Sequence, residues 1–454
     1  MSRYLLLLTA LCLGACSTLK PWINEPLEQN STIDSAAAAQ RDGSALFALT
    51  LSGGCARAAA FGYGVMQELR ATPCCWNDKT SNVLDAVDIV SGVSGGSIVA
   101  AYYAAFGADR FEGFERDFLR QGFQDSLIDT LFSPGSLYDL TSPWYGRGHL
   151  LERRLDQLYA GMTYGDVMRR PRHPQLVVTA TDMSLGTGFD FTAQQFDLIC
   201  SKLDKVPLSF AVAASSSVPL VLSPLTLRNY ADRCPKPPEP RPSNTAISSD
   251  YRTRMYEAQR QSYVDAKSRP YIHLVDGGLS DNLGVRHLLD RAVGGGLNAA
   301  CDDIQVKPGS VKRLVIITVN AERDPARRID EYDTVPRATE VVDALLFGAG
   351  NRATVETQEF LADAARAWQE SVGKSQQGGP SSFAPDARIF LVQVNLRDAP
   401  EGERRTRLLQ VPTAFSISEE EVTSLIAAGR EVLRGSKAFQ DLRESMAAAP
   451  GERP

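Results

Sequence analysis

Residues 87–101, which read VDIVSGVSGGSIVAA, decide how this chain folds. The apolar run Val87–Val90 predicts a buried strand, and the small-residue run Ser97–Tyr102 predicts a helix. Between them, residues 92–96 (GVSGG) fit the pattern G-x-S-x-G. A central serine on a sharp turn from strand to helix is typical of a nucleophile elbow, and the glycines permit the turn. The stretch therefore predicts that Ser94 is a catalytic serine; an ordinary Gly/Ser turn is the alternative.

Further strand-like runs alternate with helical stretches along the rest of the chain. The expected strands are residues 46–51, 175–181, 271–275, 313–319 and 388–394, and the expected helices include 55–70, 251–267, 338–369 and 419–433. Strands that alternate with helices form sheets covered on both faces. The sequence therefore predicts an α/β fold with a largely parallel central sheet and helices on both sides of it.

The N-terminus has the pattern of an export signal. A basic start at Met1–Arg3 is followed by the apolar stretch 4–13 and by small residues before Cys16. This stretch is too short to cross a bilayer as a helix. Residues 13–16 (LGAC) resemble the bacterial lipobox, which makes Cys16 the expected lipidation site; a signal peptide with a chance cysteine is the alternative. The residue after Cys16 is Ser17 rather than an aspartate, which resembles lipoproteins that are sorted to the outer membrane. We expect a lipid-anchored protein of the bacterial cell envelope, at the outer membrane and facing the periplasm.

Composition narrows the choice of partners. The net charge of −6 comes without a basic stripe, so nucleic acid is not an expected partner. No run of eighteen apolar residues follows the signal, and no C-x-x-C pair indicates a zinc site, so no metal is expected. An oxidising periplasm permits disulfides. Six cysteines besides Cys16 follow the signal, and among their fifteen full pairings we favour Cys200 with Cys234.

Three loops carry candidate chemistry, each at the end of an expected strand. They are residues 53–57 (GGCAR), the turn at Ser94, and Asp276–Gly278. Loops at the carboxyl ends of parallel strands meet at one edge of the sheet. Glycines in the first loop allow main-chain N–H groups to converge, as an oxyanion hole requires. A phosphate-binding loop is the alternative, but the GK[ST] ending is missing. The D-G-G tripeptide by itself also fits a simple turn.

Together and in this order, these motifs resemble those of the patatin-like phospholipase family. Residues 214–219 (ASSSVP) resemble the A-S-x-A-x-P segment of that family, and residues 179–182 with 189–191 resemble its central strand pair. The resemblance covers roughly residues 44–290. Two departures stand out. Cys55 occupies the place of a third glycine in the oxyanion loop, and Ser217 replaces an alanine.

The resemblance implies a three-layer patatin-like fold and a two-residue catalytic dyad in which Ser94 is the nucleophile and Asp276 its partner. It implies an oxyanion hole formed by the amides of Gly53, Gly54 and Cys55. Arg57 is expected to support that loop or to bind an anionic head group; a surface arginine is the alternative. No metal or organic cofactor is implied. The expected partners are a phospholipid or another acyl ester, and a membrane surface reached through the lipid anchor.

The histidines offer an independent check on a dyad. The chain has four, at positions 149, 173, 273 and 287. A hydrolase with a Ser-Asp-His triad in the usual chain order needs a histidine after the aspartate. Only His287 follows Asp276, and a solvated or capping role suits it better. The scarcity of candidates favours a dyad.

These observations predict a signal peptide over 1–15, a polar tether over 16–44, a patatin-like catalytic domain over 45–300 and an α/β extension over 301–454. The expected activity is hydrolysis of acyl esters of phospholipids or lysophospholipids through an acyl-enzyme. Two alternatives are open: an acyltransferase with the same nucleophile, and a non-catalytic lipid-binding lipoprotein of the envelope.

Overall fold

The computed structural model describes residues 17–28, 44–74, 81–171, 173–234, 251–290, 309–324, 332–337, 349–372 and 381–447, with the single residues 292, 306, 341 and 344. Cys16, the predicted lipidation site, lies outside the described residues. None of the helices within these ranges is long and apolar enough to cross a membrane.

An eight-stranded mixed sheet forms the centre of the molecule, in the order β10-β9-β1-β4-β5-β8-β7 with β6 paired to β5. Neighbouring strands from β10 to β5 run parallel: β10 (Phe383–Asn395), β9 (Val311–Asn320), β1 (Ala45–Leu51), β4 (Ile89–Val93) and β5 (Gln175–Asp182). β8 (Tyr271–Val275), β7 (Leu225–Arg228) and β6 (Thr187–Asp190) pair antiparallel. The predicted α/β fold with a largely parallel sheet is confirmed; the antiparallel strands were not expected.

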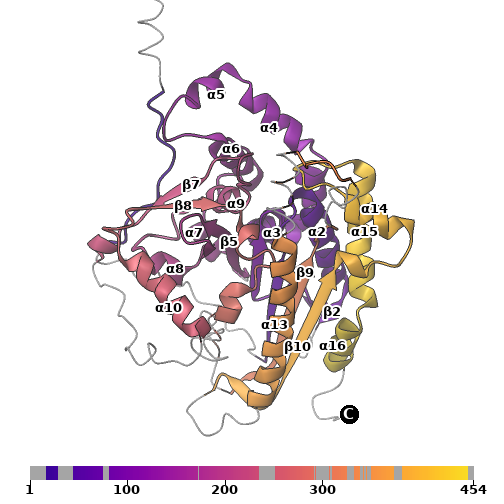
Figure 1. Cartoon of the computed structure of the whole chain (residues 1–454). Coiled ribbons are helices and arrows are strands. Elements are labelled where there is room, and N and C mark those ends of the chain that lie inside the picture. Colours follow the sequence, from indigo (N-terminus) through magenta and orange to yellow (C-terminus); the bar gives the residue numbers. More distant parts are fainter. Residues whose placement is uncertain are drawn as a thin grey trace, which may run out of the picture.

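Helices cover both faces of the sheet (Figure 1). α2 (Cys55–Ala71), α3 (Gly95–Phe111), α9 (Leu208–Ser215) and α15 (Glu419–Gly435) share one hydrophobic core, and α13 (Ala349–Val372) contributes to a second. Further α-helices in the described ranges are α4 (Phe123–Leu131), α5 (Pro134–Asp139), α6 (Arg147–Tyr159), α7 (Tyr164–Met168), α8 (Ala193–Leu198), α10 (Tyr251–Val264), α14 (Glu403–Gln410) and α16 (Lys437–Ala447).

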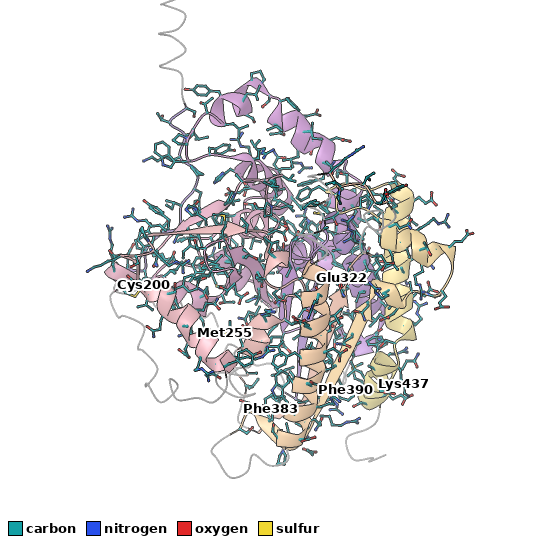
Figure 2. All side chains as sticks on the ribbon, viewed as in Figure 1. Cys200, Met255, Glu322, Phe383, Phe390 and Lys437 are labelled. Atoms are coloured by element: carbon teal, nitrogen blue, oxygen red, sulfur yellow. A yellow bond between two sulfur atoms is a disulfide. The ribbon has the colours of Figure 1, made fainter. Side chains whose placement is uncertain are left out.

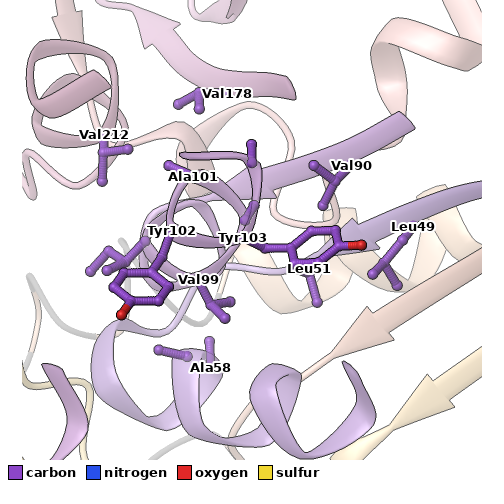
Figure 3. Close-up of a cluster of buried hydrophobic side chains, with 14 of the residues drawn as sticks. Leu49, Leu51, Ala58, Val90, Val99, Ala101, Tyr102, Tyr103, Val178 and Val212 are labelled. Carbon is purple, nitrogen blue, oxygen red and sulfur yellow. The ribbon is translucent and has the colours of Figure 1, made fainter. Parts of the chain in front are cut away.

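The side chains of β1 alternate between the two cores, as the pleat of a strand requires. Leu49 and Leu51 belong to the larger core, whereas Leu46 belongs to the core that includes Leu361 of α13. In the larger core, α3 lies against the sheet, and Val99 and Tyr103 lie among the strand side chains (Figure 3). β1 is therefore buried on both sides, which explains why its sequence is apolar at every position but Thr50.

Residues 17–28, within the predicted tether, pack against the domain. The side chain of Asn24 is buried and donates to Ser201 Oγ at 2.8 Å and to the carbonyl oxygen of Arg228 at 2.9 Å. The amide of Ser17 donates to Thr141 Oγ1 at 2.7 Å. The chain just after the predicted lipid anchor is thus fixed to the surface at these points.

The predicted disulfide between Cys200 and Cys234 is present, with 5.4 Å between the two Cα atoms. It joins the end of α8 to the residue that precedes the Pro-rich segment 235–250. Cys74 is also disulfide-bonded, and among the described cysteines Cys55 is a free, buried thiol.

Two glycines set the close contact between α2 and α15. A Cβ atom at Gly64 would collide with the backbone of Ile426, and one at Gly429 would collide with the carbonyl oxygen of Phe61. Helix backbones approach this closely only where no side chain separates them. α15 therefore completes the core around α2, although the two helices lie far apart in the sequence.

We expect Gly429→Ala to lower the free energy of unfolding by about 1–3 kcal/mol, because the added methyl overpacks a fixed helix contact. Gly435→Ala is the matched control on the same helix, since nothing lies within 4 Å of a Cβ atom there. Urea unfolding followed by circular dichroism measures both. Equal stability of the two variants would contradict this account of the contact.

Candidate active site

Ser94 lies on the turn between β4 and α3, buried at 2% exposure. Its backbone adopts φ 47° and ψ −119°, a strained conformation for a residue with a side chain. A Cβ atom at Gly92 would collide with the backbone of Ser97 within the turn, and one at Gly95 would collide with the carbonyl of Cys55 in the neighbouring loop. The Ser94 amide donates to Ser215 Oγ at 2.8 Å, and Ser97 Oγ donates to the Ser94 carbonyl at 2.6 Å. These bonds hold the strained turn in place.

Asp276 follows β8 and reaches Ser94 by an unexpected route. β4 ends at Val93, which pairs with Thr179 of β5, whereas β5 continues to Asp182. β8 enters antiparallel beside that overhanging end of β5, with Val275 opposite Thr181. The next residue therefore points back toward the end of β4. Ser94 and Asp276 line the same cleft, and the Ser94 hydroxyl acts to lower the pKa of the Asp276 carboxyl.

Three further contacts fix Asp276. Its Oδ1 accepts from the Gly278 amide at 2.8 Å, and its carbonyl accepts from Thr181 Oγ1 at 2.8 Å. Its amide donates to the carbonyl oxygen of Ser217 at 2.9 Å. Desolvation by burial raises the pKa of the Asp276 carboxyl to about 6, against the lowering effect of the bond from Gly278 and of the Ser94 hydroxyl.

The last residue of α9 and the residues that follow it hold Ser94 and Asp276 in place. Ser215 Oγ accepts from the Ser94 amide and donates to the Thr179 carbonyl at 2.6 Å. Two residues later, Ser217 accepts from the Asp276 amide, and its own hydroxyl donates to Ala213 at 2.8 Å. Sequence reasoning marked this segment only by family resemblance. The one signal in the chain was a run of three serines on an otherwise apolar helix.

The loop 53–55 lies beside Ser94, and its amides differ in their availability. The Gly53 N–H donates to the Asn282 carbonyl at 3.0 Å. Within the described residues, no acceptor takes the N–H of Gly54 or Cys55. Of the three predicted oxyanion donors, the N–H groups of Gly54 and Cys55 are therefore the two that can bind an oxyanion. Asn282, which anchors the loop, was missed by the sequence analysis.

Cys55 carries a left-handed φ of 49°, a conformation that favours glycine and accounts for the glycine expected there. Its side chain is buried. Desolvation by burial, followed by the nearby Asp276 carboxylate, raises the pKa of the Cys55 thiol to about 12. The thiol is therefore neutral and does not compete with Ser94 as a nucleophile.

Arg57 is a buried support for the loop. Its Nε donates to the Ala321 carbonyl at 2.8 Å, and its Nη1 donates to Val411 at 2.8 Å and to Thr413 Oγ1 at 3.1 Å. Burial, and then the charge of Arg323, lowers the pKa of Arg57 to about 10. The side chain connects the start of α2 to two C-terminal segments. The alternative that Arg57 is a surface arginine is wrong, because the residue is buried.

These groups open onto a cleft of about 630 Å³, part of it open to solvent. Its wall includes Ser94 and Asp276, the loop glycines, an apolar part and a charged part. The lining residues are Gly53, Gly54, Arg57, Ser94, Val218, Pro219, Asp276, Gly278, Leu279, Asn282, Glu322, Arg323, Gly350 and Thr413. Figure 2 labels Glu322, whose pKa burial raises to about 7. The cleft therefore presents both apolar and charged surfaces to a ligand.

The described histidines lie elsewhere. His149 accepts from the Gly146 amide at 3.0 Å, and burial lowers its pKa to about 4. His273 is paired with Thr226 at 2.9 Å, His173 lies beside Pro174, and His287 is buried. None of them lines the cleft. In the ranges that the structure covers, no group of His, Cys, Asp and Glu could hold a metal ion.

A family model described as "Patatin-like phospholipase" matches residues 49–289 of the 454. No curated protein gives a significant match. Among solved structures, human GIVD cytosolic phospholipase A2 is similar at 12% identity with a TM-score of 0.47, over 93% of this chain and 66% of that one. VipD from Legionella pneumophila is similar at 12% identity with a TM-score of 0.31, over 96% and 73%.

The chain spans 66% of the human enzyme in one structure and 60% in another. The family match itself covers more than half of the chain and contains the Gly53 loop, Ser94 and Asp276. The chain belongs to the patatin-like phospholipase family.

Proposed function

We propose that the protein is a serine acyl hydrolase that cleaves ester-linked acyl chains of phospholipids or lysophospholipids. The observation that carries the proposal is that Ser94, on a strained turn from strand to helix, and the buried Asp276 lie together in the wall of an open cleft. The cleft has an apolar wall at Val218, Pro219 and Leu279, which suits an acyl chain, and cationic groups at Arg57 and Arg323, which suit a phosphate.

Ser94 Oγ attacks the acyl carbonyl carbon while Asp276 accepts the hydroxyl proton. The tetrahedral intermediate collapses with departure of the alcohol, which takes the proton from Asp276. Water then attacks the acyl-enzyme, again with Asp276 as base, and releases the fatty acid and free Ser94. None of the described histidines lines the cleft, which favours a dyad over a triad.

The proposed oxyanion donors are the N–H groups of Gly54 and Cys55. They begin α2, so the positive end of the helix dipole adds to the stabilisation of a negative oxygen. The bond from Arg57 to Val411 and Thr413 holds this loop against the rest of the domain. Arg57 thus acts by positioning, and its remaining Nη2 faces the loop beside Gly54.

Asp276 is suited to its role by its environment. An ordinary carboxylate is a weak base at neutral pH, and burial raises the pKa of this one to about 6. It is then a stronger base than a solvated aspartate and is still ionised at neutral pH. General-base assistance of this kind contributes about 10²–10⁴ in rate.

The cell-envelope location is also part of the proposal. It rests on the export pattern of residues 1–15 and on the lipobox-like sequence at Cys16. Acyl transfer to an acceptor other than water would use the same nucleophile, and analysis of the products separates the two reactions.

We expect Ser94→Ala and Asp276→Asn each to reduce hydrolysis of a short-chain nitrophenyl ester to background, because each removes one member of the dyad. A fluorophosphonate probe should label the wild type and should not label Ser94→Ala. His149→Ala, His173→Ala, His273→Ala and His287→Ala serve as controls that retain most activity. Loss of activity in one folded histidine variant, with Asp276→Asn still active, would overturn the dyad.

A second prediction concerns stability. Because the folded pKa of Asp276 lies above its ordinary value of 3.8, the stabilising form is the protonated one. The protonated carboxyl makes its full contribution to the free energy of unfolding below about pH 4. This contribution is lost as the pH rises through about 6. Asp276→Asn cannot ionise, so from pH 4 to pH 8 the wild type should lose about 1–3 kcal/mol relative to this variant. Urea unfolding of both proteins at the two pH values measures the difference, and parallel pH dependences would contradict the burial argument.

A third prediction concerns the anchor. Cys16→Ala removes the thiol that would carry the lipid, so we expect this variant to incorporate no radiolabelled palmitate in cells. Cys301→Ala is the control and should incorporate label like the wild type. Incorporation into the Cys16→Ala protein would show that the lipobox interpretation is wrong.

A further inference from the structure

A group of large apolar side chains stands exposed around α5 and near the cleft. They are Phe132 (69% exposed), Leu137 (49%), Tyr138 (52%), Trp144 (53%), Leu220 (72%) and Val221 (58%), and we call them the apolar face. Single exposed apolar residues are ordinary, whereas several large ones on neighbouring segments mark a candidate interaction site. α5 projects at the end of the molecule shown uppermost in Figure 1.

The apolar face continues into the cleft. Val218 and Pro219 line the cleft, and Leu220 and Val221 follow them directly. Leu220 has a left-handed φ of 70°, an unfavourable conformation for this residue that leaves its side chain in solvent. Arg147 Nη2 donates to the Leu220 carbonyl at 2.7 Å, which joins the rim of the cleft to the chain just after Trp144.

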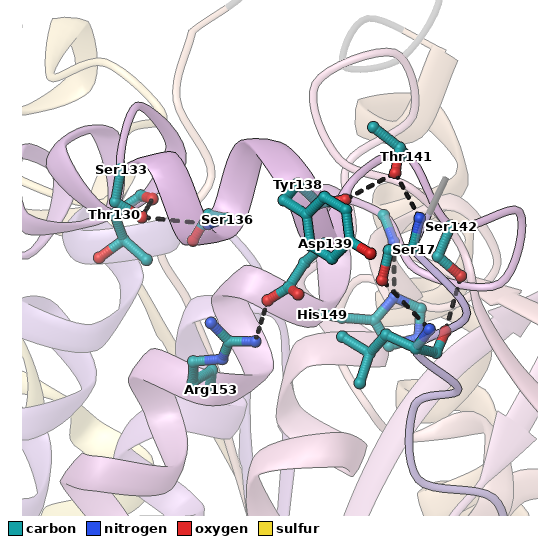
Figure 4. A network of polar contacts seen from close by, with 12 residues as sticks. Ser17, Thr130, Ser133, Ser136, Tyr138, Asp139, Thr141, Ser142, His149 and Arg153 are labelled. Atoms are coloured by element: carbon teal, nitrogen blue, oxygen red, sulfur yellow. Dashed lines mark hydrogen bonds and ion pairs between the residues drawn. The ribbon is translucent and has the colours of Figure 1, made fainter. Parts of the chain in front are cut away.

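The start of the described chain lies on the same face. The Ser17 amide donates to Thr141 Oγ1, and Ser142 Oγ donates to the Leu19 carbonyl at 2.6 Å (Figure 4). Lys20 lies over the Trp144 ring, 5.0 Å from its centroid. The proposed lipid anchor is the residue before Ser17 in the sequence. A membrane that holds this anchor would therefore lie close to the apolar face.

The charge around the face suits a phospholipid surface. From Phe132 to Arg147 the sequence has one acidic residue, Asp139, which is paired with Arg153 at 3.0 Å. Lys20 and Arg147 add cations at the edge of the face. Aromatic rings and cations beside exposed aliphatic side chains are the composition of segments that lie in the interface of a bilayer.

We propose that the apolar face docks on a phospholipid bilayer, so that the mouth of the cleft opens onto the lipid. This rests on the proposed function for the substrate and on the proposed anchor for the orientation. Docking would let an acyl chain pass from the bilayer along Leu220 and Val218 toward Ser94 without crossing water. The occupant of the face is thus the membrane, and neither a second copy of the chain nor a protein partner.

The first test measures contact with lipid directly. Full-length protein is bound to vesicles of phosphatidylethanolamine and phosphatidylglycerol, with and without acyl chains that carry bromine, a contact quencher of tryptophan. We expect brominated lipid to quench fluorescence in the wild type and this quenching to be lost in Trp144→Phe. Equal quenching in both proteins, or none in the wild type, would overturn the proposal.

The second test separates docking from chemistry. Leu137→Glu should lower hydrolysis of vesicle phospholipid about tenfold, because burial of one leucine side chain is worth at least that factor. Its hydrolysis of a soluble nitrophenyl ester should stay at the wild-type rate. Met255→Glu is the matched control, since Met255 is 63% exposed on α10, far from α5 (Figure 2).

The outcomes keep the two proposals apart. Equal vesicle hydrolysis by Leu137→Glu and Met255→Glu would overturn docking while the soluble ester still reports the chemistry. If no variant hydrolyses either substrate, the proposed function fails, and the quenching of Trp144 decides docking alone. A dimer in sedimentation that Leu137→Glu dissociates would assign the face to a second copy and overturn the membrane proposal.

Discussion

The parallel pairing of β1 with β4 is the contact on which the candidate site depends. Leu51 lies opposite Gly92, so both strands end at the same level of the sheet. The loop after β1 and the turn after β4 then meet, and Gly95 packs against the Cys55 carbonyl with no space for a side chain. One register shift would separate the proposed oxyanion donors from Ser94 and turn the buried face of β1 toward the wrong core.

The strand and helix elements around this contact could be predicted from local sequence. Largely apolar runs predicted the strands β1, β5 and β9, and the motif G-x-S-x-G predicted the turn at Ser94. Each of these signals lies within a few neighbouring residues. The antiparallel direction of β8 could not be predicted, because strand direction depends on the path of the intervening chain. The sequence analysis placed Asp276 beside Ser94 on the assumption that both follow parallel strands, whereas β8 is antiparallel to β5. The actual cause is that β4 is shorter than β5.

Contacts that hold the site escaped prediction for a related reason. Ser215 and Asn282 act through a hydroxyl and a main-chain carbonyl, and the sequence alone gives neither their direction nor their distance from Ser94. The availability of a given amide is likewise a tertiary property, as the occupied N–H of Gly53 shows. Arg57 could not be assigned for the same reason, because its acceptors lie more than 250 residues away.

The disulfide between Cys200 and Cys234 encloses α9 and the serines that hold both Ser94 and Asp276. Closure of a loop of 34 residues restricts the unfolded chain by roughly 3–4 kcal/mol. A chain in a reducing compartment would lack this restriction, and Ser94 and Asp276 would be held less firmly there. If the protein is exported as we propose, oxidation on export would act as a maturation step, which completes the fold around these two residues only after the chain has left the compartment in which it is made.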